Sequence, residues 1–303
     1  MRRLGALSAV AVLLLCGCRR AGELPPGEVL RRSTAASAQL QSVQYDVTID
    51  LDMRNPLMAV LGKAALHGTL AGGGQDAAFS ATVNGSLAKP GQPATTLQMI
   101  ADVVNEAQNS YVFVHTLAVQ PEPLLLGGSQ AMLGRWWKIP REGGQFPSQP
   151  LTPDPQFLRA QAAVVTVTKD HGLERINGRD AYHYTVAIDP DRLLALLQST
   201  AEQHGKPFDA AVTRAQILQY DAKGDLWIAE DSFLVQRLAW TVISRVPTGT
   251  VPPVRLRFDA LLRNHDSAPS VTVPADSELF QKEMLLQNLL FLPAASGSVR
   301  SSP

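Results

Sequence analysis

Residues 43–53 read Val43-Gln44-Tyr45-Asp46-Val47-Thr48-Ile49-Asp50-Leu51-Asp52-Met53. Apolar and polar side chains alternate through all of it, and in an extended backbone such alternation sends the two sets to opposite sides. The sequence therefore predicts a strand with one apolar face and one face in water.

The same alternation returns along most of the chain. Apolar residues fall at every second position in residues 66–70, 77–83, 97–103, 182–188 and 254–262, while residues 111–119 are apolar on both faces. Further strands are expected at 132–139, 164–169, 172–176, 225–230, 233–244 and 271–273. Gly72-Gly73-Gly74 and Asn177-Gly178 are typical of turns between strands.

Helical spacing is confined to a few segments. Residues 28–40, 189–205 and 208–218 are expected to be helices, with Asp189 as an N-cap, Pro190 in the first helical position and Gly205 beyond the end. The proline-rich stretch 141–155 reads as a surface loop, followed by a short helix at 157–163. About eleven strands and so few helices favour an α+β fold, in which helices cover one large curved antiparallel sheet.

The N-terminal residues have the pattern of an export signal. Arg2 and Arg3 precede an apolar run from Leu4 to Leu15, which is shorter than the roughly 20 residues that cross a bilayer as a helix. The run ends in Leu15-Cys16-Gly17-Cys18, which resembles a lipobox, the motif whose last cysteine receives lipid. We therefore expect a lipoprotein signal peptide over 1–17, acylation of Cys18 and a tether over 18–27. An ordinary cleavable signal or a short membrane anchor is the alternative.

Cysteine and charge counts exclude several classes of protein. Cys16 and Cys18 are the only cysteines, so the processed chain has no thiol for catalysis, zinc ligation or a disulfide. Lys and Arg number 27, as do Asp and Glu, and removal of Arg2 and Arg3 leaves the processed chain slightly acidic. A nucleic-acid partner is not expected from such a charge distribution.

No catalytic or metal-binding pattern stands out in the sequence. The six histidines are scattered without a His-x-x-x-His or Glu-x-x-His spacing, and Gly127-Gly128-Ser129 lacks the nucleophile elbow of hydrolases. Asp46, Asp50 and Asp52 share the wet face of one strand, which we interpret as a solvated surface rather than a cation site. We expect no enzymatic activity, no metal and no cofactor.

Several motifs together resemble a known family. They are the lipobox, a short helix ending in Leu40-Gln41-Ser42-Val43, the strand Gly134-Arg135-Trp136-Trp137-Lys138-Ile139, the hairpin from Gly172 to Tyr184, the pair Asp225–Asp231 and Leu234–Arg237, and Val271-Thr272-Val273-Pro274-Ala275. With these features the chain resembles the LolA-like superfamily, in its LppX/LprG-type branch of lipid-binding lipoproteins. The resemblance covers roughly residues 27–276, and its motifs are patterns of β structure rather than chemical signatures.

The resemblance implies a half-barrel domain over 28–276, with helices over an apolar cavity that takes lipids or other apolar molecules. The side chains expected to face that cavity are Val47, Ile49, Leu51, Phe79, Val83, Leu97, Met99 and Phe258. The alternative is a non-carrier envelope lipoprotein that binds a protein partner in a structural or stress-regulatory role. In either case acyl chains such as palmitate on Cys18 would hold the chain to the extracytoplasmic side of the cell membrane. In a cell with two membranes, the residue after the cysteine is Arg19 rather than an acidic residue, so export to the outer membrane is a further alternative.

The C-terminal segment departs from this pattern. Residues 277–292 include Leu279, Phe280, Leu285, Leu286 and Leu289 to Leu292, too many apolar side chains for a free tail in water. They predict a helix that packs over the open side or mouth of the sheet as a lid, either as a gate that a ligand displaces or as a permanent core helix. Docking on the membrane surface or on a partner protein is the alternative. The remaining residues, 293–303, are expected to be a disordered tail.

Overall fold

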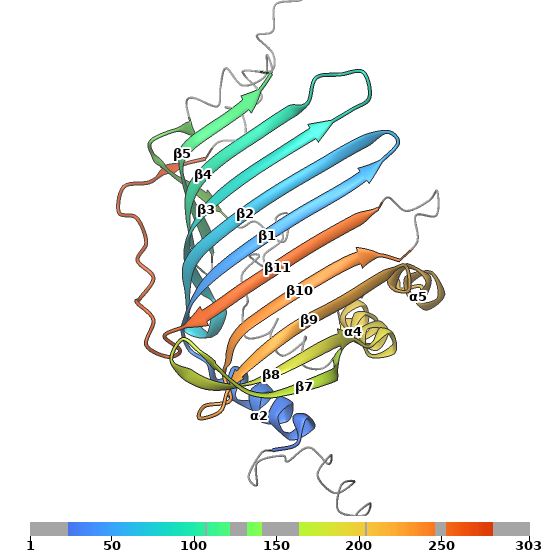
Figure 1. The fold of residues 1–303 in the computed structure, drawn as a ribbon. Helices are drawn as coiled ribbons and strands as arrows, with labels where there is room; N and C mark the ends of the chain where they lie inside the picture. The colour runs from blue at the N-terminus through green and yellow to red at the C-terminus, as the bar shows by residue number, and fades with distance from the viewer. Residues whose placement is uncertain are drawn as a thin grey trace, which may run out of the picture.

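Strand β1 (Val43–Asn55) follows the alternation that begins at Val43 and lies inside a large sheet. The computed structural model describes residues 24–106, 108–121, 132–140, 164–203, 205–245 and 253–280. Within these ranges twelve strands form one sheet in the order β12-β6-β5-β4-β3-β2-β1-β11-β10-β9-β8-β7. The sheet is strongly curved and unclosed, with β12 at one edge and β7 at the other (Figure 1). The expected α+β fold with one large curved sheet is thereby confirmed.

The other strands are β2 (Met58–Ala71), β3 (Asp76–Ala88), β4 (Thr95–Asn105), β5 (Asn109–Gln120), β6 (Trp136–Pro140), β7 (Val165–Ile176), β8 (Arg179–Ile188), β9 (Tyr220–Ala229), β10 (Val235–Ser244), β11 (Val254–Arg263) and β12 (Glu278–Leu279). In the described parts of the chain the helices are α2 (Pro26–Gln39), α4 (Pro190–Gln203) and α5 (Ala210–Ile217), and η1 (Gly72–Gly74) is a 3-10 turn.

Two runs of antiparallel strands meet at the ladder between β1 and β11. From β1 to β6 each strand pairs with the next one in the chain, and so does each strand from β7 to β11. The ladder that joins the two runs pairs Gln44 with Arg263 and Met53 with Val254. Strand β12 is the exception, because it pairs with β6 in parallel.

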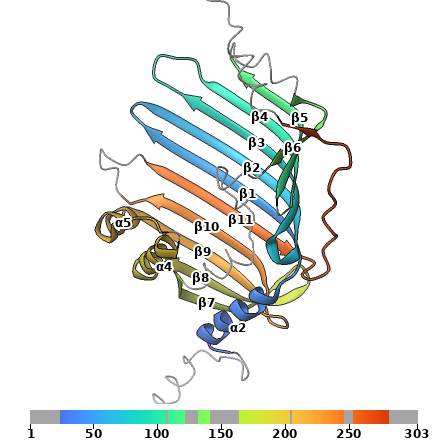
Figure 2. The same ribbon diagram turned by 180° about the vertical axis from the view of Figure 1, so that it is seen from behind.

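The three helices lie on the hollow side of the sheet, which we call the inner face; the opposite side is the outer face (Figure 2). Helix α2 turns Val29, Ser33 and Ser37 toward the sheet, at the four-residue spacing that aligns side chains on one helix face. Val29 is fully buried and packs with Tyr184 and Ile228. A neighbouring apolar cluster joins strands β1, β2, β3, β10 and β11.

Tandem tryptophans in β6 point to opposite faces, as expected for neighbours in a strand. Trp137 is only 2% exposed, and its indole Nε1 donates a hydrogen bond to the carbonyl oxygen of Met132 at 3.0 Å. Trp136 is half-buried and lies 5.5 Å from Phe113, ring centre to ring centre. One of the two tryptophans, Trp137, therefore belongs to the core.

The prediction of a strand at residues 271–273 is wrong. These residues belong to no strand, because the chain between β11 and β12 crosses from the middle of the sheet to its β6 edge (Figure 1). A connector on such a path has no neighbouring strand with which to form a ladder. Glu278 and Leu279 provide the final strand instead, at positions where the sequence predicted the start of a helix.

The structure has one strand, β7, where the sequence predicted two strands with a break at residues 170–171. It runs without a break from Val165 to Ile176 and absorbs two irregularities, between Val167 and Lys169 and between Asp170 and Gly172. Gly172 has a φ of 78°, a conformation that glycine adopts at little cost in bulges. The interruption in the pattern therefore marks bulges rather than a turn.

Some expectations fall on residues outside the described ranges. They concern the signal peptide and Cys18, the tether up to residue 23, the loop at 141–155, the helix at 157–163, and the C-terminal segment from residue 281 onward. These remain predictions of the sequence.

Candidate apolar binding site on the inner face

Strand register arranges the inner face into rows that run across the sheet. Directly paired residues of antiparallel strands share a face, so each row can be followed from ladder to ladder. One row contains Met99, Val83, Ala64, Ile49, Phe258 and Trp240. The next row contains Leu97, Gly85, Gly62, Leu51, Leu256, Val242 and Ala222.

The residues expected to line a cavity differ in burial along these rows. Val47 is 1% exposed and sits in the filled core, where Ile49, Phe79 and Phe258 pack against the same cluster. The remaining ones are more open: Leu51, Val83 and Met99 are half-buried, and Leu97 is 37% exposed. Their contact with a ligand remains a prediction.

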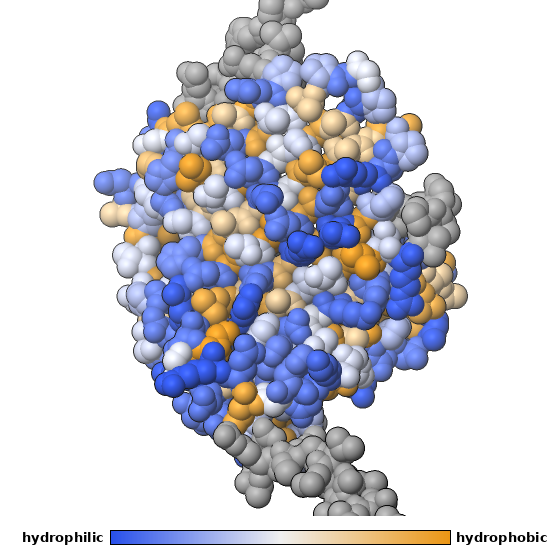
Figure 3. Space-filling view, viewed as in Figure 1, coloured by the Kyte–Doolittle hydropathy of each residue, from blue (hydrophilic) through white to orange (hydrophobic). Residues whose placement is uncertain are grey.

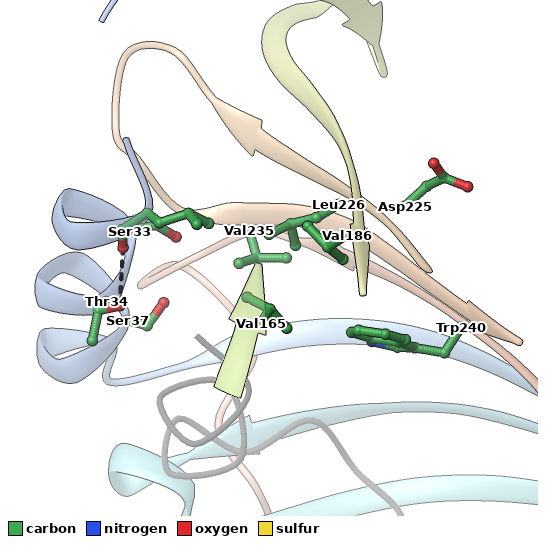
Figure 4. A pocket seen from close by; sticks show the side chains of 10 residues that line it. Ser33, Thr34, Ser37, Val165, Val186, Asp225, Leu226, Val235 and Trp240 are labelled. Carbon is green, nitrogen blue, oxygen red and sulfur yellow. Dashed lines mark hydrogen bonds between the residues drawn. The ribbon is translucent and has the colours of Figure 1, made fainter. Parts of the chain in front are cut away.

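A small hollow lies between α2 and the sheet. Ser33, Thr34 and Ser37 of the helix face Val186 and Trp240 across it, whereas Asp225 points away from it (Figure 4). Its volume of about 20 Å³ holds one water molecule at most. This hollow is therefore a gap in packing rather than a binding site.

A much larger hollow opens at the other end of the inner face, beneath α4 and α5. Its volume is about 330 Å³, at the lower end of the range typical of ligand pockets. Its lining is mostly apolar: Ile188, Pro190, Leu193, Leu197, Thr213, Gln216, Ile217, Tyr220, Asp221, Ala222, Val242 and Arg245. Ala222 and Val242 belong to the row of Leu51 and Leu97, so the row ends inside this hollow. We call it the α4–α5 cavity.

Helices α4 and α5 cover this cavity loosely. Neither helix has a buried residue, although α4 contains four leucines. Leu197 is 38% exposed, Val212 53% and Leu218 41%. On the side of Leu197, Ala201 and Phe208 a second hollow of about 440 Å³ adjoins the pair. The helices thus expose apolar surface that firm packing on the sheet would have buried.

Polar contacts fix the ends of the helix pair. The Asp189 carboxylate accepts hydrogen bonds from the backbone N–H groups of Asp191 and Arg192 at 2.9 and 3.1 Å, as expected for an N-cap. Asp209 caps α5 in the same way through the N–H of Val212 at 3.0 Å. Arg214 forms an ion pair with Asp191, which ties α5 to the start of α4. The helices are therefore held at their ends, while their apolar faces stay only partly covered.

The outer face carries the polar half of the alternation. Hydrophilic residues cover most of the view in Figure 3, with hydrophobic ones scattered between them. Asp46 pairs with His67 and Arg263, Asp50 with Lys63, and Asp52 with Arg54. Each of the three carboxylates thus has a cationic partner of its own.

The four leucines of α4 are visible in the sequence, but their pattern did not identify the cavity. Leu193, Leu194, Leu196 and Leu197 are adjacent pairs, and such pairs cover a wide arc of the helix surface rather than one narrow stripe. The pattern predicts a helix with apolar surface to cover. It does not say that the helix stands away from the sheet.

Among the described residues, no helix is both long enough and apolar enough to span a membrane. No protein-family model and no curated protein matches the sequence.

Several solved structures are similar to this chain over most of its length. LprF from Mycobacterium bovis matches over 82% of this chain and 97% of its own, at 15% identity and a TM-score of 0.40. The lipoprotein LppX from Mycobacterium tuberculosis matches over 82% and 100%, at 12% identity and a TM-score of 0.35. A LolA superfamily protein from Nitrosomonas europaea matches over 82% and 96%, at 12% identity and a TM-score of 0.23. Only the third of these is described as a LolA superfamily protein, and the likeness carries neither a superfamily nor a ligand over to this chain.

Proposed function

We propose that this chain is a membrane-anchored lipoprotein that binds or carries lipids or other apolar molecules on the inner face of its half-barrel. Acyl chains on Cys18 would hold it on the extracytoplasmic side of the membrane. The observation that carries the proposal is the α4–α5 cavity of about 330 Å³ at the end of a row of apolar inner-face residues.

Binding at this site needs no covalent step. Burial of acyl chains is worth ~0.8 kcal/mol per methylene, so a chain of about a dozen carbons gains enough to bind without a charged contact. The half-buried residues Leu51, Val83 and Met99 extend the apolar surface away from the cavity. A ligand longer than the cavity would lie along these rows.

The loosely packed helices α4 and α5 form the entrance through which a ligand would reach the α4–α5 cavity. Because α4 and α5 bury no residue, moving them outward costs little packing energy compared with opening the core. The polar groups Arg245 and Asp221 lie at the same cavity, with Arg245 Nη2 and Asp221 Oδ1 4.0 Å apart. We expect the apolar part of a ligand to enter between the helices and its polar end to stay near these two side chains.

Native mass spectrometry of the chain purified from membranes tests the proposal most directly. Co-purifying lipid is the expected result. A chain that is consistently free of lipid, yet recovered with a stoichiometric protein partner, would instead favour the non-carrier alternative, to which the exposed Leu197, Val212 and Leu218 would then belong.

A cavity-filling variant locates the site. Ala222→Trp should fill the α4–α5 cavity and reduce uptake of a fluorescent fatty acid at least severalfold, and Val83→Trp makes the same test of the adjoining row. Val212→Trp is the matched control, because Val212 is 53% exposed and does not line the cavity. Equal uptake by a folded Ala222→Trp protein and the control would exclude the α4–α5 cavity as the site.

A further inference from the structure

Three aromatic rings form a stack on the outer face, across neighbouring strands β7, β8 and β9. The ring of His183 lies between those of His171 and Trp227, with centroids 4.2 and 4.4 Å away and interplanar angles of 11° and 14°. Arg237 lies over the other side of Trp227, 4.9 Å from the ring centre. Such a position leaves the ring of His183 little freedom to turn.

Glu174 lies beside one ring nitrogen of His183. Its Oε2 lies 2.8 Å from Nδ1 of His183 and also accepts a hydrogen bond from Nε1 of Trp227 at 3.0 Å. In a neutral imidazole with Nδ1 donating to this carboxylate, the lone pair is on Nε2. Metal-binding histidines very often have a carboxylate at their other nitrogen in this way.

The remaining nitrogen of His183 lacks a hydrogen-bond partner. Nε2 is buried and makes no hydrogen bond within the described part of the chain, although Asp225 Oδ1 lies 3.4 Å away. A lone pair that faces a carboxylate oxygen at this distance needs a positive charge between the two atoms. A proton or a metal ion would supply that charge.

His171 and Asp225 complete a set of three ligand atoms. The Thr185 hydroxyl lies 2.8 Å from His171 Nε2 and donates to Asp225 Oδ1 at 2.9 Å, so it holds both side chains beside His183. One ligand atom each from His171, His183 and Asp225 lies within 4.8 Å of the others. The nearby cation Arg237 is already engaged by the Asp259 carboxylate. The two carboxylates Glu174 and Asp225 therefore leave the cluster with a charge that favours a further cation.

We propose that His171, His183 and Asp225 bind a first-row divalent transition ion such as Zn²⁺, with Glu174 as the outer carboxylate that orients His183. Two imidazoles and one carboxylate suit such an ion and leave a position for water. Parallel rings cannot both aim a lone pair at one ion, so His171, which is exposed, rotates out of the stack when the ion binds. The cluster lies on the face opposite the apolar rows, so this proposal stands or falls independently of lipid binding.

Calorimetric titration with Zn²⁺ tests the site. The full chain is purified in detergent without a polyhistidine tag, stripped with a chelator and dialysed. One Zn²⁺ per chain is expected. His183→Gln and Asp225→Asn should raise the Kd at least tenfold, and Glu174→Gln by 10- to 100-fold, as is typical for loss of an outer-shell partner. His115→Gln is the matched control, because His115 pairs with Asp102 on the same face but outside the cluster, and its Kd should not change.

A second readout covers variants that fail to fold. Co²⁺ bound to the unmodified chain should give the visible absorption bands of a site with nitrogen ligands, and an excess of Zn²⁺ should abolish them. Absence of saturable Zn²⁺ binding, equal weakening by His115→Gln, or displacement of Zn²⁺ by equimolar Ca²⁺ or Mg²⁺ would each overturn the proposal.

Discussion

Gly68 lies where the sheet has no room for a side chain. A Cβ atom at this position would come within 2.4 Å of the Ala78 carbonyl oxygen, 2.5 Å of Phe79 Cβ and 2.8 Å of the Tyr45 hydroxyl. The first two atoms belong to the backbone and to the base of a side chain, so neither can move without shifting β3. Glycine at this position is therefore required by packing against the neighbouring strand.

Gly68→Ala should lower the free energy of unfolding by about 1–3 kcal/mol, the usual cost of forcing an extra methyl group into a filled core. Gly62→Ala in the same strand is the control, because its Cβ would meet only Leu51 Cβ at 3.7 Å. Urea unfolding of the two variants measures the difference. Equal stabilities would mean that the strands can separate enough to accept the methyl group.

His265 makes stability depend on pH. Its Nε2 lies 2.9 Å from the carbonyl oxygen of Val235, and burial lowers the pKa of the imidazole below its usual 6.5. The hydrogen bond to Val235 and the charge of Asp266 oppose this shift of the pKa, and Arg179 adds to it. Because the folded pKa is the lower one, the unfolded chain binds more protons between the two values. This contribution to stability is therefore complete above the unfolded pKa and is lost as the pH falls toward the folded one.

The expected outcome is a smaller loss of stability on acidification in His265→Gln than in the unmodified chain. Thermal unfolding between pH 7.5 and 5 measures both slopes, and the amide of glutamine can still donate to Val235. Parallel slopes for the two proteins would show that His265 is accessible to protons in the folded state.

At the scale of single elements, β12 is a short attachment of the C-terminal segment to the edge of the sheet. Its two residues are exposed and pair with Trp137 and Lys138, and Arg135 lies 3.1 Å from the Glu278 carboxylate. Phe280 then packs edge-on against Trp137, with ring centroids 6.0 Å apart. The C-terminal segment, which the sequence predicts to be a lid, therefore begins at the β6 edge of the sheet.

Truncation after Ala275 should leave a folded protein that takes up apolar dye faster. Among the described residues, the truncation removes a two-residue strand and one aromatic contact, the contact being worth about 0.5–1.5 kcal/mol. Phe280→Ala is the companion variant, because it removes the contact with Trp137 and keeps the rest of the segment. Loss of folding would identify residues 276–303 as part of the core. Unchanged stability and dye uptake would indicate that the segment packs elsewhere.

At the scale of the whole molecule, the anchor predicted at Cys18 would place the half-barrel at a membrane surface. One acyl chain holds a protein to a bilayer only marginally, whereas two or more hold it stably, and a lipobox cysteine receives at least two. We expect Cys18→Ser to abolish incorporation of labelled palmitate and to block the usual processing. Continued labelling of the serine variant would refute the interpretation of Leu15-Cys16-Gly17-Cys18 as a lipobox.

The sequence alone determined the local elements of this protein. Alternation from Val43 to Met53 specifies a strand, because the period of two depends only on neighbouring residues. Asn177-Gly178 specifies the turn before β8, where both residues have positive φ, and Asp189 specifies the start of α4. The inner-face residues followed from the same alternation, which gives the face of a side chain but not its depth: Val47 is buried, while Leu97 is exposed.

Only the tertiary structure decided what depends on distant partners. The pairing of Gln44 with Arg263 joins the two runs of strands, and no local pattern records it. Residues 271–273 alternate like a strand but meet no neighbour, whereas Glu278 does. The α4–α5 cavity exists because the helices stand away from the sheet, and His171, His183 and Asp225 come together because strand register places β7, β8 and β9 side by side. Hydrogen-bonded ladders between residues far apart in the chain fix these arrangements, so a periodicity read along one segment cannot contain them.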